Sequence, residues 1–356
     1  MRVRLLGRNG KPAMTNPRIK SDRFHYIDVA KGLLILMVAY GHFWQHVEPL
    51  DAHAAFYLRQ VNNTFLAFYM PAFFFITGYC SDFSKPLYAN IIHSFRLIML
   101  PAFVFSILVF IANHHFDKAK VITFLSSLVL YGGSYWFLTA LFVARVLYGI
   151  LSHYLKGNLL YAVSASSFFL GFLLSDIPHE YELWYFVHVL LLMPFIALGQ
   201  FFRNKTIPFS KSGFFIFAYI GVLGITVLSA QRGILKSDFA YLVPIITQRL
   251  FNLNTTMLPS LVMLCMLGIL MIMSISKHID TNRILEYLGR NSLVIYCSHV
   301  IVMAYITHNL GGAILKHNLM PIGAMSIVCF VSIIIACCGI AYLFNLRYLK
   351  ILIGKF

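Results

Sequence analysis

Long runs of hydrophobic residues, separated by short polar segments, dominate the pattern along this chain. A helix that spans a bilayer needs about 20 mostly apolar residues. Ten runs reach or approach this length, and the eighth and tenth are the clearest. They cover residues 28–47, 63–80, 90–112, 134–153, 158–175, 184–202, 213–231, 257–275, 291–308 and 321–344. The pattern predicts an all-α, polytopic transmembrane bundle with about ten spanning helices.

The same pattern divides the chain into three segments. Residues 1–27 form a basic N-terminal arm, residues 28–344 the transmembrane domain, and residues 345–356 a basic tail. The stretch 239–251 is too short to span and is broken by Pro244, so an interfacial or re-entrant segment is expected there. We find no internal repeat and no soluble domain.

Composition supports a membrane environment. Only 11% of the residues are charged and 60% are hydrophobic, whereas soluble domains carry roughly 25% charged residues. The formal net charge is +16, which in a soluble protein would suggest nucleic acid. Here the basic residues sit mainly in short segments between the apolar runs, as the positive-inside rule requires. We therefore expect the lipid bilayer, and not nucleic acid, as a partner.

The distribution of Lys and Arg predicts the orientation of the bundle. With the N-terminus inside, the inner segments hold 18 of these residues and the outer segments hold seven. The outer loop 176–183 is acidic and contains neither Lys nor Arg. Both termini are therefore predicted to be cytoplasmic.

Three further cations, Lys31, Arg96 and Arg145, lie inside predicted spans. A cation in hydrocarbon is costly, which makes each one a candidate for function, although snorkelling toward headgroups is the alternative. The alternating direction of the spans places all three in the cytoplasmic half. They predict a pocket for a polyanion from the cytosol. Coenzyme A fits, but a nucleotide or a lipid headgroup fits this geometry equally well.

His42 follows Lys31 by 11 residues in the first predicted span. This spacing is about 16 Å along a helix and close to three full turns, so both side chains share one face. An imidazole with a pKa near 6.5 suits a general base that deprotonates an alcohol attacking a thioester. A hydrogen bond to a neighbouring helix is the alternative. The six cysteines show no metal-ligand spacing, and we predict no metal.

Five short motifs occur in an order that resembles a known family. They are Lys31 to His42 within YIDVAKG…GH, FYMPAFFFITGY at 68–79, Arg96 with Pro101, YWFLTALF at 135–142, and LGRNSLVIYCSH at 288–299. Together they resemble the acyltransferase-3 group of multi-spanning membrane acyltransferases, and most closely its fucose 4-O-acetylase-like branch. The resemblance covers about residues 26–344. Lys31 stands where many members of the group have arginine.

This resemblance implies an enzyme of the bacterial cytoplasmic (inner) membrane. Such an enzyme moves an acyl group, usually acetyl, from cytosolic acetyl-CoA to a hydroxyl of a surface glycan or a lipid-linked saccharide. By the same resemblance His42 is the catalytic histidine, and Lys31 and Arg96 contact acyl-CoA. Arg145 joins them because of its predicted depth alone.

Four other residues are weaker candidates. His299 occupies the position of the family's late histidine, where a second catalytic role and a bond between helices are both open. Trp136, Glu182 and His188 lie near the outer ends of their spans and have the chemistry to contact a sugar. For Trp136, anchoring in the aromatic belt is the alternative.

Two other classes of function remain open. A transporter or flippase for a lipid-linked sugar or polyanion would also place charges inside spans, but such proteins often show internal repeats. A membrane scaffold without catalysis would not require embedded cations at one depth. The membrane O-acyltransferase is the leading prediction. The identity of the glycan, the length of the acyl chain, and direct transfer against an acyl-enzyme stay open.

Overall fold

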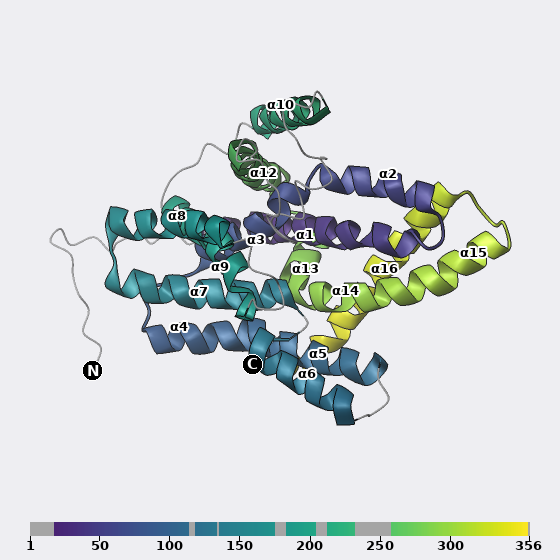
Figure 1. Ribbon diagram of the computed structural model, residues 1–356, viewed down its shortest axis with the longest axis horizontal. Coiled ribbons are helices and arrows are strands. Elements are labelled where there is room, and N and C mark those ends of the chain that lie inside the picture. The colour runs from purple at the N-terminus through teal and green to yellow at the C-terminus, as the bar shows by residue number, and fades with distance from the viewer. Residues whose placement is uncertain are drawn as a thin grey trace.

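The computed structural model describes residues 18–113, 118–133, 135–174, 183–203, 212–231 and 258–354. Helices, joined by short connections, account for nearly all of these residues, and none of them lies in a strand (Figure 1). The prediction of an all-α fold is confirmed.

The helices follow the predicted runs closely. The first half holds α1 (Arg18–Val47), α2 (Ala52–Asn63), α3 (Leu66–Cys80), α4 (Leu87–Ser94), the π-helical turn η1 (Phe95–Met99), α5 (Leu100–Asn113), α6 (Lys118–Tyr131), α7 (Trp136–Tyr154) and α8 (Gly157–Leu173). The second half holds η3 (Leu183–Tyr185), α9 (Phe186–Phe202), α10 (Ser212–Gln231), α12 (Leu258–Ile279), α13 (Arg283–Arg290), α14 (Ser292–Ile306), η6 (Thr307–Gly311), α15 (Gly312–Lys316), α16 (Ile322–Phe344) and η7 (Leu349–Ile353).

Seven helical segments within the described residues are long and apolar enough to cross a membrane. They are His25–Val47, Leu87–Ala112, Trp136–Tyr154, Leu183–Phe202, Pro259–Ile279, Ser292–Lys316 and Ile322–Phe344. The predicted runs 63–80, 158–175 and 213–231 fall on the shorter apolar helices α3, α8 and α10. The chain is therefore a multi-pass membrane protein. The side that each terminus faces stays a prediction, and the stretch 239–251 lies outside the described residues.

Three segments differ in detail from the simple pattern of runs and loops. The connections expected to hold Arg59 and Lys118 contain helices, α2 and α6. Asp51 begins α2, because its carboxylate accepts a hydrogen bond from the backbone N–H of Ala54 at 2.7 Å. The third run is not a regular helix, because the π-helical turn η1 separates α4 from α5. Arg96 lies in that turn.

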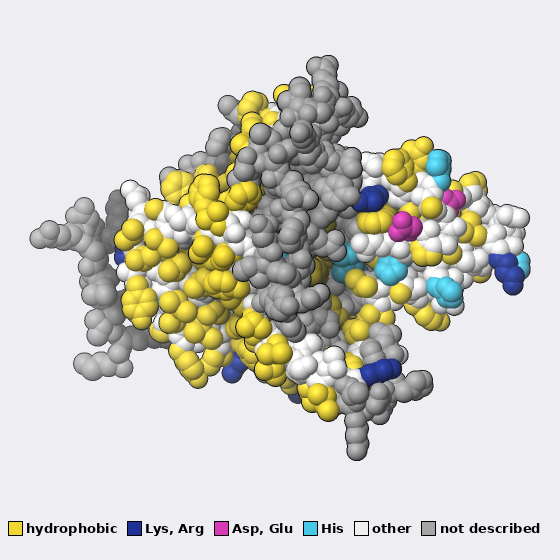
Figure 2. Space-filling model, in the orientation of Figure 1, with side chains coloured by type: hydrophobic (Ala, Val, Ile, Leu, Met, Phe, Trp, Pro, Cys, Tyr) yellow, Lys and Arg dark blue, Asp and Glu magenta, His cyan; other side chains and the backbone are white. Residues whose placement is uncertain are grey.

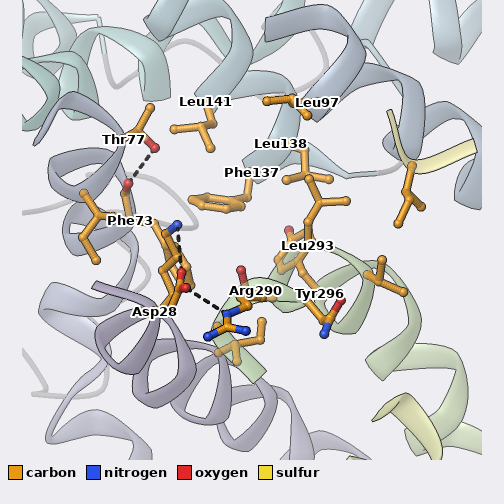
Figure 3. Close-up of a pocket in the computed structure, with 18 residues that line it drawn as sticks. Asp28, Phe73, Thr77, Leu97, Phe137, Leu138, Leu141, Arg290, Leu293 and Tyr296 are labelled. Carbon is orange, nitrogen blue, oxygen red and sulfur yellow. Dashed lines mark hydrogen bonds and ion pairs between the residues drawn. The ribbon is translucent and has the colours of Figure 1, made fainter. Parts of the chain in front are cut away.

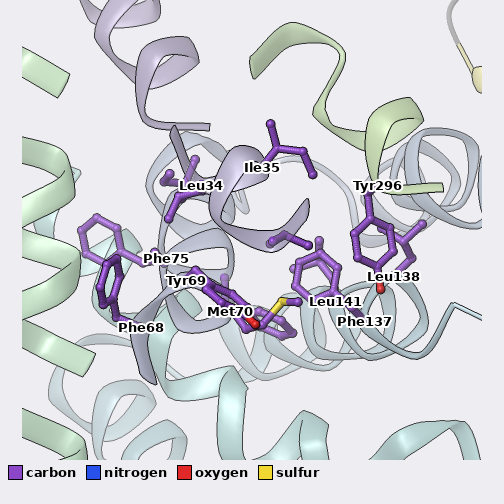
Figure 4. Packing of buried hydrophobic residues seen from close by; sticks show 14 of the residues in the cluster. Leu34, Ile35, Phe68, Tyr69, Met70, Phe75, Phe137, Leu138, Leu141 and Tyr296 are labelled. Atoms are coloured by element: carbon purple, nitrogen blue, oxygen red, sulfur yellow. The ribbon is translucent and has the colours of Figure 1, made fainter. Parts of the chain in front are cut away.

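The core forms where α3 packs against α9 without intervening side chains. A Cβ on Gly78 would lie 2.0 Å from the carbonyl oxygen of Ile196, and one on Gly199 would lie 2.0 Å from that of Phe75. Only glycine permits this approach of two backbones. Figure 4 shows the surrounding packing, in which Met70 of α3 lies near Phe137 and Leu141 of α7, and Phe75 lies beside Phe68. The motif FYMPAFFFITGY therefore encodes helix packing.

The outer surface of the bundle is apolar over long stretches. Side chains such as Phe217, Val129 and Ile327 are 77%, 70% and 68% exposed. On the face shown in Figure 2, hydrophobic side chains cover the region of α7 and α8. Histidines and the few charged side chains gather at the opposite end, over α2 and α15. An apolar belt of this kind suits contact with lipid.

Two short elements lie close to the candidate site. Helix α13 approaches α1 closely, because a Cβ on Gly289 would lie 1.8 Å from the Asp28 carbonyl oxygen and one on Gly32 would lie 2.1 Å from that of Leu285. In the predicted basic tail, η7 folds back onto η1 and α5. Its Ile353 is buried, and Gly354 packs on the backbone of Arg96 in the left-handed conformation.

Candidate active site

A polar cavity of about 540 Å³ lies between α1, the end of α3, α4 and α7. Its wall carries four basic side chains, contributed by Lys31, Lys85, His93 and Arg145. The carboxylate of Asp82 also lines it. The Ser84 hydroxyl donates to this carboxylate at 2.6 Å and the Ser84 N–H at 3.1 Å, and these bonds hold the pKa of Asp82 below its usual value.

A second, more apolar cavity of about 560 Å³ adjoins the first. The two share four lining residues, which are Lys31, Ile76, Thr77 and Leu97. Figure 3 shows the second cavity, with Phe137, Leu138 and Leu141 of α7 facing Asp28 and Arg290 across it. Both volumes lie in the range of pockets that hold small-molecule ligands. The shared wall makes them two parts of one cleft.

An ion-pair network borders the apolar cavity where α1 meets α13. Asp28 lies 3.7 Å from the Lys31 ammonium and 3.2 Å from Nε of Arg290. Arg290 also donates to Glu286, and Glu286 lies 2.9 Å from Nδ1 of His25. The hydrogen bond with His25 is the main cause of the lowered pKa of Glu286. Lys31 and Arg290 therefore each have a carboxylate beside them at this border of the cavity.

His42 and His299 lie side by side at the far end of α1. Their ring centroids are 5.2 Å apart. His42 is half-buried, and His299 is 1% exposed. Nδ1 of His299 lies 2.6 Å from the carbonyl oxygen of Tyr296, and only a protonated nitrogen can donate there. In the neutral ring Nε2 therefore carries the lone pair, and it has no hydrogen-bond partner among the described residues.

The face of α1 that borders the cavities continues to these histidines. Lys31, Ile35 and His42 follow one another at helical spacing on that face, and the first two line the apolar cavity. On α14, Tyr296 lines the same cavity. Its ring lies 5.6 Å from that of His299. The apolar cavity is thus bordered by the two helices that carry the histidine pair, although neither histidine is among the residues that line it.

A row of rings connects the histidine pair to two of the other candidates. Trp136 lies 5.2 Å from His188 and 6.0 Å from Phe137, measured between ring centroids. Phe137 in turn lies 5.3 Å from Tyr296. His188 is buried, whereas Trp136 is half-buried.

The structure brings six of the sequence-predicted residues together in three pairs. Lys31 and Arg145 line one cavity, His42 contacts His299, and Trp136 contacts His188. Arg96 is exposed and lines neither cavity, so its contact with a donor stays a prediction. Glu182 lies outside the described residues. No cluster of His, Cys, Asp or Glu suited to a metal occurs in the described ranges.

Several lining residues were not singled out from the sequence. Arg290 and Tyr296 lie inside the motif LGRNSLVIYCSH, so the motif itself was the available signal. Lys85 counted only toward the charge of an inner segment. No feature of the sequence indicated that His93 lines the cavity, because nothing in the sequence shows that α4 faces Arg145.

Comparison with known proteins gives two matches. The acyltransferase-3 family model, described as an acyltransferase domain, matches residues 24–342. Among curated proteins, the chain is similar to the nodulation protein NolL of Mesorhizobium japonicum, at 28% identity over 172 residues. That match covers 47% of the chain and 44% of NolL, so less than half of this relative's length is spanned. No solved structure matches the chain significantly.

Proposed function

Because the chain belongs to the acyltransferase-3 family of membrane acyltransferases, we propose that it is an O-acetyltransferase that acts across the bacterial inner membrane. The donor is cytosolic acetyl-CoA, and the acceptor is a hydroxyl of a surface glycan or a lipid-linked saccharide. Membership of this family favours an enzyme over a transporter or flippase. Placement in the fucose 4-O-acetylase-like branch stays a prediction.

One observation supports the proposal: the cleft is cationic at one end, and its apolar part is lined by Ile35 and Tyr296, which lie on the two helices that carry His42 and His299. Lys31 and Arg145 line its polar part. Lys31 and His42 are about 16 Å apart along α1. A donor with phosphates at one end and a thioester at the end of a long, thin arm has this distribution of charge. With the N-terminus inside, as the Lys and Arg count predicts, the polar part would face the cytosol.

The histidine pair has the chemistry for direct acyl transfer. An unprotonated nitrogen of His42 takes the proton of the acceptor hydroxyl as its oxygen attacks the thioester carbonyl carbon. The C–S bond then breaks, and the coenzyme A sulfur leaves with the proton returned by the imidazolium. Atoms and charges balance without a further reagent.

His299 supports this step as the neighbour of His42. The Tyr296 carbonyl fixes its tautomer through Nδ1, which leaves Nε2 as a proton acceptor in a buried setting. A ring oriented by a carbonyl is the arrangement that enzymes use to position a catalytic imidazole. Trp136 and His188 are proposed to contact the acceptor sugar, since the row of rings joins them to this pair.

Mass spectrometry of surface glycans tests the proposal. Cells that lack the gene should lose O-acetyl groups from one glycan. The wild-type gene should restore them, and His42→Ala should not. His317→Ala is the matched control, because His317 is exposed at the end of α15. A glycan that keeps its acetyl groups in the deletion strain but fails to reach the surface would contradict the proposal and indicate transport.

A further inference from the structure

Helices α2 and α3 pass along α1 one after the other, with a break between them (Figure 1). A Cβ on Gly41 of α1 would lie 3.0 Å from Oδ1 of Asn62, near the end of α2, and 3.0 Å from the hydroxyl oxygen of Tyr69, near the start of α3. At its other end α3 still follows α1, since the hydroxyls of Tyr79 and Tyr26 are 3.0 Å apart. The break therefore lies at the level of Gly41, inside the first candidate membrane span.

The last two residues of α2 place unpaired polar atoms at this break. Asn62 is 3% exposed and Asn63 is 5% exposed. Oδ1 of Asn62 is an acceptor and Nδ2 of Asn63 is a donor, and neither has a hydrogen-bond partner within the described ranges. A buried polar group that stays unpaired costs free energy. The two amides therefore point to a bound ligand.

The other polar groups of the break are paired. The Thr64 hydroxyl donates to the carbonyl oxygen of Val61 at 2.7 Å, and the Thr64 carbonyl accepts a hydrogen bond from the Tyr219 hydroxyl. The backbone N–H groups of Thr64 and Phe65 each donate to a carbonyl of α2 at 3.1 Å. The turn is thus held by its own hydrogen bonds, and the two asparagine side chains are not needed to form it.

The chemistry of the break suits a neutral ligand that carries hydroxyl groups. A hydroxyl can donate to Oδ1 of Asn62 and accept from Nδ2 of Asn63, whereas a carboxylate only accepts and would leave Asn62 unpaired. Gly41 has no side chain, so space remains between α1 and the groups that face it. Irregular backbone at membrane depth is tolerated where it is buried in protein or lines a cavity, and broken helices form substrate sites in other membrane proteins.

We propose that Asn62 and Asn63 form a subsite for the acceptor, in which a neutral, hydroxyl-bearing part of the acceptor donates to Asn62 and accepts from Asn63. This inference rests on the proposed function for the identity of the acceptor as a saccharide. His42 follows Gly41 directly, about 1.5 Å along the helix axis and roughly 100° around it. A saccharide that extends from one face of α1 to the next contacts both the subsite and the histidine. The two asparagines thus select the acceptor and do not take part in proton transfer.

Acyl-transfer kinetics test the subsite on the purified protein in lipid nanodiscs. The substrates are labelled acetyl-CoA and the surface glycan isolated from a strain that lacks the gene. Asn62→Leu and Asn63→Leu should each raise the KM of the glycan about three- to tenfold, because a hydrogen bond is lost, and should leave the KM of acetyl-CoA unchanged. Asn309→Leu is the matched control, because Asn309 is exposed and its amide donates to the Tyr305 carbonyl. Equal glycan KM values in the wild type and both variants would overturn the inference.

Thermal unfolding separates a ligand subsite from a purely structural role. Leucine is close to asparagine in size and removes an unpaired polar atom, so the unfolding midpoint of Asn62→Leu should stay the same or rise. A lower midpoint in both asparagine variants would assign the amides to holding the fold, for example through a bound water, and would overturn the inference. Gly41→Ala keeps both amides but fills the space beside them, and it should also raise the KM of the glycan. An unchanged KM in Gly41→Ala would count against the location.

Binding of the same glycan without acetyl-CoA, measured by equilibrium dialysis, separates this inference from the proposed function. Glycan binding that is weakened by Asn62→Leu, in a protein that transfers no acetyl group, would uphold the subsite and reject the proposed function. Acetyl transfer to the glycan with the same KM in the wild type, Asn62→Leu and Asn63→Leu would reject the subsite and uphold the proposed function.

Discussion

The contact between α1 and α13 gives the sharpest prediction about the cleft, through the substitution Gly289→Ala. A Cβ at position 289 would lie 1.8 Å from the Asp28 carbonyl oxygen, and real Cβ contacts are essentially never closer than 3.0 Å. The two backbones would therefore have to separate by about 1.2 Å. The Arg290–Asp28 contact of 3.2 Å would open with them, and so would the wall of the apolar cavity that these residues line.

The expected loss of stability follows from two opposing effects. Overpacking against a rigid backbone costs about 1–3 kcal/mol, and a backbone contact puts this position at the upper end of that range. Alanine in place of glycine in a helix recovers roughly 1 kcal/mol. The net destabilisation is about 2 kcal/mol, which corresponds to a fall in the unfolding midpoint of about 3 °C, because the entropy of unfolding grows with the length of this 356-residue chain. The Kd of coenzyme A should also rise, because the cavity wall moves.

Thermal unfolding in detergent, followed by intrinsic fluorescence, measures this change. Gly339→Ala on α16 is the control, because nothing lies within 4 Å of its added Cβ. It should leave the midpoint unchanged or raise it slightly. An unfolding midpoint for Gly289→Ala that equals that of Gly339→Ala would refute the close approach of α1 and α13.

Three further predictions concern single groups. His299→Ala should lower the rate of acyl transfer by about a hundredfold, measured with labelled acetyl-CoA, without changing the Kd of coenzyme A; an unchanged rate would remove His299 from the site. Cys80 is exposed and lines the polar cavity, so maleimide should label it, and bound coenzyme A should slow the labelling. An equal rate of labelling with and without coenzyme A would contradict the location of the donor. The lowered pKa of Glu286 contributes stability above its unfolded pKa of about 4.3, and this contribution is lost as pH falls through the folded value. Below about pH 4 the unfolding midpoint of the wild type should therefore fall more steeply than that of Glu286→Gln, and parallel curves would contradict this.

The helices were largely predictable because their apolar runs have the length that a bilayer imposes. The runs 257–275 and 321–344 correspond to α12 and α16 within a few residues at each end. The helical nature of α2 and α6 was not predictable from length, because both are too short to span. The irregular turn η1 could not be predicted either, since a π-helical turn has no periodicity of its own at this length.

The pairing of residues far apart in the sequence was only partly predictable. Depth along alternating spans predicted that Lys31 and Arg145 lie at one level, and both line the polar cavity. Depth does not say which face of a helix points inward, and Arg96 on η1 is exposed. The contact of His42 with His299 depends on how α1 and α14 are rotated about their axes. The packing between helices sets that rotation, which cannot be predicted from a single sequence.

The most direct test of the central claim is a single-turnover measurement with radioactive acetyl-CoA and the acceptor glycan. The wild-type protein should move the label to the glycan. His42→Ala should transfer it at least about a hundredfold more slowly while binding coenzyme A with unchanged affinity. Transfer by His42→Ala at the wild-type rate would contradict the account. Protein-bound label that forms without acceptor and disappears in His42→Ala would replace direct transfer with an acyl-enzyme.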